Sequence, residues 1–81
     1  MDAPRLSVYP NPTSDVVHVQ LPQTVTSAEL FIRDMNGKVV QAQSLNSSEI
    51  VQLDVSKLER GVYILNVVSD ENQWQERLVK Q

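Results

Sequence analysis

The sequence contains no cysteine, only two glycines and one histidine, and each of these shortages excludes a class of site. Without cysteine no disulfide can staple the fold, and the cysteine count gives no indication of the redox compartment. Two glycines cannot build a glycine-rich phosphate loop, and one histidine cannot form a metal site that needs several. Every apolar stretch is much shorter than the roughly 20 residues of a transmembrane helix.

A basic excess is also missing. Seven lysines and arginines stand against ten acidic residues, which gives a net charge of −3 with both signs mixed along the chain. A nucleic-acid-binding domain would need a basic stripe or patch, so this class is excluded. The first residues, MDAPRLS, lack the charged and apolar regions of a secretory signal, so we expect any export to depend on another segment.

The length and the apolar content predict one small domain. A chain of 81 residues is expected to form one domain. Its 41% apolar residues suffice for a modest core and do not fit a disordered tail. We expect residues 5–81 to form this domain and residues 1–4 to be the end of a linker or an added start of the chain.

Apolar residues recur with a period of two in seven short runs rich in β-branched side chains. In one of them, Val17, Val19 and Leu21 fall on one face and His18 falls on the other. A spacing of about 10 residues predicts an all-β fold, a small immunoglobulin-like antiparallel β-sandwich of about seven strands. The runs are 5–9, 15–21, 28–34, 38–45, 50–55, 61–69 and 74–81.

One stretch between two of these runs carries a turn signal. In DMNGK, residues 34–38, Gly37 can supply a positive φ after Asn36, so we expect a hairpin between two strands. In the fourth run Val39 and Val40 are adjacent rather than alternating, which makes that strand fit the period least well.

The segment LERGVY, residues 58–63, matches the corner of an immunoglobulin-type sandwich. In that device a tyrosine near the start of the penultimate strand donates its hydroxyl back to the backbone a few residues upstream. We expect Leu58 to plug the core, Gly61 to occupy a crowded or positive-φ position and Tyr63 to bury its ring.

Two prolines bracket one asparagine in YPNPTSD, residues 9–15. Proline lacks an N–H and fixes φ, so Pro10 is expected to end the first strand after Tyr9. Pro12 restricts Asn11 to extended geometry. We therefore expect a stiff connector that leads into the second strand.

No catalytic or metal-binding constellation is visible, so we expect neither an enzyme nor a cofactor. His18 lies on the polar face of a strand and is expected to be solvated. The aspartates lack the spacing of an oxygen-rich calcium loop. Trp74 leaves two interpretations open: it covers the edge of the core, or it stacks on a sugar or a partner.

Four motifs in order resemble the C-terminal sorting domain of type IX secretion cargo. They are SVYPNPTSD at 7–15, LFIRDMNGKVV at 30–40, LDVSKLERGVYILNV at 53–67 and ERLVKQ at 76–81. The resemblance extends from about residue 6 to residue 80. The chain has arginine at position 77, where lysine is also common in the family, and a glutamine after Lys80. The residues that match the family's motifs and have a structural role are Tyr9, Pro10, Asn11, Pro12, Asp34, Gly37, Leu58, Gly61 and Tyr63.

The resemblance implies a folded address rather than an enzyme. Such domains direct a larger cargo across the outer membrane, where the type IX translocon reads them. A sortase-like surface peptidase usually removes the domain, and the cargo is joined to the cell surface. The implied location is the periplasm in transit to the outer membrane, the cell surface or the medium. The alternative from the residues alone is an immunoglobulin-like adhesion or carbohydrate-binding module that uses Trp74.

The last five residues are our candidates for the signal itself. A terminal strand leaves backbone groups at an edge, open to pairing with a partner strand. We expect Leu78 and Val79 to face opposite sides, one holding the core and the other offered outward. Positive charge at Arg77 and Lys80 is expected to steer the domain toward an acidic receptor. The candidate stretch is Arg77, Leu78, Val79, Lys80 and Gln81.

Overall fold

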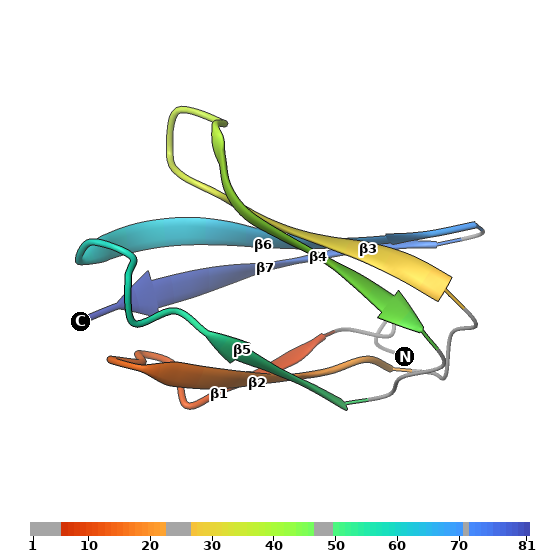
Figure 1. Ribbon diagram of the computed structural model, residues 1–81, viewed down its shortest axis with the longest axis horizontal. Helices are drawn as coiled ribbons and strands as arrows, with labels where there is room; N and C mark the ends of the chain where they lie inside the picture. The colour runs from red at the N-terminus through yellow and green to blue at the C-terminus, as the bar shows by residue number, and fades with distance from the viewer. Residues whose placement is uncertain (1–5, 23–26, 47–49, 71) are drawn as a thin grey trace, which may run out of the picture.

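Seven strands and no helix make up the described part of the chain (Figure 1). The computed structural model describes residues 6–22, 27–46, 50–70 and 72–81. Each predicted run forms a strand, so the all-β prediction is confirmed. The predicted linker, residues 1–4, lies outside the described residues. The strands are β1 (Ser7–Tyr9), β2 (Val16–Gln20), β3 (Ser27–Arg33), β4 (Val39–Asn46), β5 (Ile50–Asp54), β6 (Gly61–Ser69) and β7 (Gln73–Lys80).

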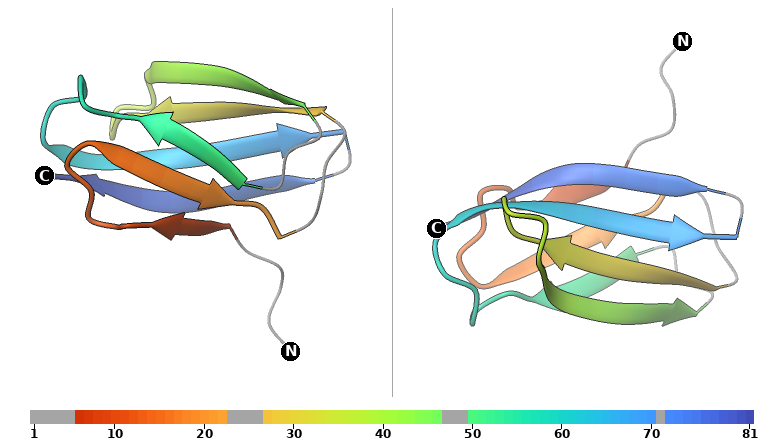
Figure 2. Two further views of the ribbon diagram at one scale, coloured as in Figure 1. Left: turned by 60° about the horizontal axis from the view of Figure 1, so that its bottom comes forward. Right: turned by 90° about the horizontal axis from the view of Figure 1, so that it is seen from above.

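The strands form two sheets packed face to face. One sheet has the order β1-β2-β5 and the other the order β4-β3-β6-β7. All neighbouring strands are antiparallel, as the sandwich prediction requires. At one side of the sandwich β1 lies beside β7, and at the other β5 lies beside β4 (Figure 2). Across the described residues, no helix has the length and apolar character needed to cross a membrane.

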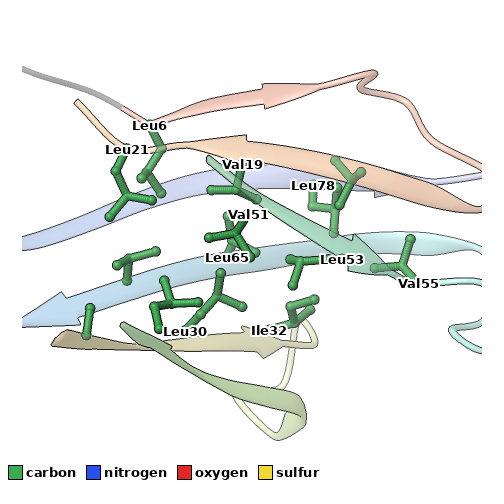
Figure 3. Close-up of a cluster of buried hydrophobic side chains, with 14 of the residues drawn as sticks. Leu6, Val19, Leu21, Leu30, Ile32, Val51, Leu53, Val55, Leu65 and Leu78 are labelled. Atoms are coloured by element: carbon green, nitrogen blue, oxygen red, sulfur yellow. The ribbon is translucent and has the colours of Figure 1, made fainter. Parts of the chain in front are cut away.

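The core lies between the sheets and follows from the period-two pattern. In β2, Val17 and Val19 are fully buried, and between them His18 is half-buried. Leu30 from β3 and Leu65 from β6 meet them from the opposite sheet (Figure 3). Burying one such side chain contributes roughly 1.5–3 kcal/mol, so the stability of a domain this small depends on few residues.

A β-bulge explains the adjacent valines of β4. Ile32 pairs with Gln41, but Arg33 pairs with Val39, so Val40 is an extra residue in the ladder. A bulge interrupts the alternation of a strand and increases its twist. Both valines are consequently exposed at the solvent side of an edge strand.

The hairpin between β3 and β4 forms as predicted. The Gly37 N–H donates to the Asp34 carbonyl at 3.0 Å, and the Asp34 N–H donates to the Lys38 carbonyl at 2.9 Å. One carboxylate oxygen of Asp34 also accepts the N–H groups of Asn36 and Lys38. Gly37 has a φ of +87°, a conformation that glycine adopts without steric cost.

Candidate functional site

The segment of two prolines lies along the outer edge of β7, far from it in sequence. The Asn11 side chain donates through Nδ2 to the Arg77 carbonyl at 2.8 Å. Its Oδ1 accepts the Val79 N–H at 2.9 Å. The amide thus offers β7 the donor and the acceptor that the backbone of a neighbouring strand would offer.

Thr13 continues this contact with its backbone. Its N–H donates to the Val79 carbonyl at 2.9 Å, and its carbonyl accepts the Gln81 N–H at 2.8 Å. Thr13 and Lys80 form an isolated parallel bridge. The Thr13 hydroxyl turns inward and donates to the Val16 carbonyl at 2.8 Å. We call Asn11 and Thr13 together the edge clamp.

The edge clamp corrects one expectation about the end of the chain. We expected the last backbone groups of β7 to be open for pairing with a partner strand. The edge clamp instead already forms hydrogen bonds with the outward backbone groups at the end of β7. These groups are the Arg77 carbonyl, the N–H and carbonyl of Val79, and the Gln81 N–H. The proline segment does connect β1 to β2 as predicted, but its contact with β7 was not foreseen.

Leu78 and Val79 face opposite sides of the sheet, as expected. Leu78 is fully buried in the core, where Figure 3 shows it between the two sheets. Val79 is half-buried on the outer face, and it pairs with Val62. Leu78 therefore holds β7 in place, while Val79 is accessible in part.

Lys80 corrects a second expectation. We expected its charge to be offered to a receptor, but the side chain is only 7% exposed. Its Nζ donates to the Leu58 carbonyl at 3.0 Å and to the main-chain oxygen of Gln81 at 3.4 Å. A long alkyl stem covers apolar surface while the ammonium satisfies carbonyls at the rim. Lys80 therefore fastens the end of β7, and Arg77 and Gln81 remain as the exposed polar side chains of the stretch.

The end of β7 is also tied to the corner before β6. The Tyr63 hydroxyl donates to the Glu59 carbonyl at 2.7 Å, which is the predicted corner bond. Leu58 packs against the core as expected. Lys80 and Tyr63 thus take the two consecutive carbonyls of Leu58 and Glu59.

Gly61 begins β6 with a φ of +157°, a backbone angle that L-residues with a side chain rarely adopt. A Cβ built there would meet no atom within 4 Å, so the position demands glycine for its backbone angle and not for lack of space.

The structure shows the contacts of His18 and Trp74. His18 is not fully solvated as expected, because it is half-buried and its ring stacks on Tyr9 with centroids 5.5 Å apart. Trp74 is partly buried and packs against the core. This contact agrees with its interpretation as a cover for the core edge.

Hydrogen bonds from Ser56 affect the ionisation of the Asp54 carboxylate, which lies at the end of β5. The Ser56 hydroxyl and the Ser56 N–H both donate to Asp54 Oδ1, at 2.6 and 2.9 Å. These bonds favour the ionised form, so they lower the pKa of Asp54. No group of three or more histidine, cysteine, aspartate or glutamate residues that could hold a metal occurs in the described ranges.

The sequence pattern predicted the corner bond of Tyr63 but not the contacts of Asn11 and Lys80. The signal that could have indicated the Asn11 contact is an amide held between two rigid residues, since such a side chain can reproduce the hydrogen bonds of a strand.

Comparison with known families gives one match. The family model described as the secretion system C-terminal sorting domain matches residues 7–81, a range that contains every strand and the edge clamp. No curated protein matches the chain.

Proposed function

Since the chain belongs to the type IX secretion C-terminal sorting domains, we propose that it carries a larger cargo protein through the outer-membrane translocon of that system. As a sorting signal of this family it marks a precursor that is exported across the cell envelope. A sortase-like surface peptidase then removes the domain, and the cargo is attached to the cell surface. The family match over residues 7–81 is the observation that carries this proposal.

Within this function, we propose that the outward side chains of the last residues are read, rather than a free strand edge. Arg77 and Gln81 are exposed, and Val79 lies partly open on the outer face. The backbone beside them is occupied by the edge clamp. Leu78 and Lys80 support this presentation from inside the fold.

The test is a fusion of the whole chain to the C-terminus of a reporter in a host that has the translocon. We expect the reporter at the cell surface, and the same reporter without the domain retained in the cell. A wild-type fusion that stays inside would overturn the proposed function. Truncation of residues 78–81 is a poor test, because it removes buried Leu78 and Lys80, so we expect it to destabilise the domain as well.

The alternative function, a carbohydrate-binding module, depends on Trp74. That side chain packs against the core, which leaves less of its ring to stack on a sugar. A glycan-binding screen with the wild-type chain and with Trp74→Ala separates the two functions. Binding that is lost with the tryptophan would support the alternative.

A further inference from the structure

Three residues form a straight row across the outer face of the four-stranded sheet. Arg33 on β3 pairs with Ile64 on β6, and Ile64 pairs with Arg77 on β7. A buried core residue adjoins each of them in the chain, so their own side chains point to the outer face. We call these three residues the arginine row.

In this row the apolar side chain of Ile64 lies between two cationic side chains. Two strand spacings separate the arginine positions, a distance of roughly 10 Å. Between β6 and β7 lies a hollow of about 230 Å³, lined by Ile64, Gln75, Glu76 and Arg77. An apolar side chain can enter this hollow while charged groups beside it meet the guanidinium groups.

Apolar side chains border the row at Arg33 on one side and at Ile64 and Arg77 on the other, and polar Asn66 and Gln75 complete the first side. The Arg33 guanidinium lies over the Phe31 ring, 5.6 Å from its centroid. On the other side Val62 pairs with Val79, and Val62 is 37% exposed. Aromatic residues and arginine are enriched at the centre of protein interfaces, where other charged residues are depleted.

The two guanidinium groups keep most of their donors. The structure gives Arg77 no side-chain hydrogen bond within the described residues, and Arg33 donates only to the Gly37 carbonyl, at 3.2 Å. An arginine carries five N–H donors in a planar fork that matches a carboxylate. Both arginines can therefore accept a carboxylate ligand without breaking a tight internal pair.

The acidic groups nearby have hydrogen-bond partners of their own, and Glu76, which lines the hollow, is bonded within the row. Glu29 accepts the Ser44 hydroxyl at 3.1 Å. Asp34 holds the hairpin amides, and one oxygen of Glu76 accepts the Arg77 N–H at 3.2 Å. On a chain with a net charge of −3, the arginine row is thus a local basic strip.

We propose that the arginine row docks an acidic protein surface in which carboxylates flank an apolar side chain. This inference rests on the proposed function, because the partner is taken to belong to the export machinery. It places part of the address on β3, far in sequence from the last residues. An anionic membrane fits less well, since lipid recognition typically uses clusters of about four to eight lysines and arginines.

The test reverses each charge in the reporter fusion described above. We expect Arg33→Glu and Arg77→Glu to lower the amount of reporter at the surface by about tenfold or more, because like charges then meet across the interface. The matched control is Lys57→Glu, which makes the same charge change at an exposed residue of the turn between β5 and β6. It should change export by less than about twofold, as expected for a charge outside the interface.

Melting of each isolated chain separates recognition from folding. Arg33→Glu loses the bond to Gly37 and can weaken the hairpin, so Arg77→Glu is the deciding variant. We expect Arg77→Glu to melt like the wild type and to be exported poorly. Export of Arg77→Glu equal to wild type would overturn the arginine row and leave the proposed function intact. A wild-type fusion that is not exported would instead overturn the proposed function.

Sedimentation with vesicles that contain phosphatidylglycerol checks the membrane alternative. We expect no binding of the wild-type chain to these vesicles that depends on Arg33 and Arg77. Vesicle binding that both reversals abolish would replace the acidic protein by an anionic lipid surface and so refute the proposal.

Discussion

The Asn11 side chain donates a 2.8 Å hydrogen bond to the Arg77 carbonyl across 66 positions of sequence. The same amide accepts the Val79 N–H, so one side chain stands in for a short piece of strand at the edge of β7. The motif that opens the domain and the stretch that closes it are therefore one structural unit.

Asn11→Ala removes both hydrogen bonds to β7. We expect the free energy of unfolding to fall by about 1–2 kcal/mol, since each bond contributes roughly 0.5–1.5 kcal/mol net. The Val79 amide should also exchange with solvent faster, because its acceptor is gone. Chemical denaturation and amide exchange measure the two effects. Gln52→Ala, at an exposed position of β5, is the control, and equal behaviour of both variants would contradict the edge clamp.

Tyr63→Phe deletes the hydroxyl that donates to the Glu59 carbonyl. The expected loss in unfolding free energy is about 1 kcal/mol, from the lost bond and the carbonyl left without it. Tyr9→Phe is the matched control, because Tyr9 is 43% exposed and its hydroxyl has no bond within the described residues. If both variants melt at the same temperature as the wild type, the corner bond has no energetic role.

Gly61→Val adds a β-branched side chain at a φ of +157°. The surroundings leave room for it, so the expected loss of about 1–3 kcal/mol comes from backbone strain alone. Ala42→Val adds the same kind of side chain to an exposed position of β4 and should have little effect. Thermal melting that ranks the two variants in the opposite order would disprove the strain at Gly61.

Lys80→Met keeps the apolar stem but removes the ammonium that binds the Leu58 carbonyl. We expect the unfolding free energy to fall by about 1.5–3 kcal/mol, the range for a hydrogen bond to a charged group. Lys38→Met, at an exposed position of the hairpin, serves as control. A stability unchanged by Lys80→Met would show that this lysine is free to meet a receptor after all.

Asp54 should make stability depend on pH in the acid range. Its pKa in the folded chain is lowered, chiefly by the Ser56 hydroxyl. The stabilisation is therefore fully present above the unfolded pKa of about 3.9 and is lost as the pH falls through the folded pKa. Ser56→Ala should move the NMR titration of the Asp54 carboxyl to higher pH. An unshifted titration would refute the assignment.

The strands could be predicted because alternation is a local property. Whether Val17 and Val19 share a face depends only on the geometry of one strand. The corner bond could be predicted for the same reason, since Tyr63 and its acceptor Glu59 are only four positions apart in the sequence. In both cases the residues that interact are close in sequence or obey one period.

The contacts of Asn11 and Lys80 could not be obtained in this way. The Asn11 contact depends on β7 lying at the edge of its sheet and on β1 lying beside it in the other sheet. The Lys80 contact depends on the pairing of β7 with β6, which brings Lys80 to the corner before β6. The sequence pattern predicts strands but does not order them. Arg33 and Arg77 show the same limit, because they share a row only through the pairing of β6 with both neighbours.

The edge clamp also has a consequence for the order of synthesis. Residues 11 and 13 leave the ribosome before any residue of β3 to β7, but their partners at 77, 79 and 81 are made only after all of β6. A nascent or clipped chain that lacks this stretch can form neither the clamp nor the arginine row. Only a chain that has been synthesised through β7 therefore presents the assembled face.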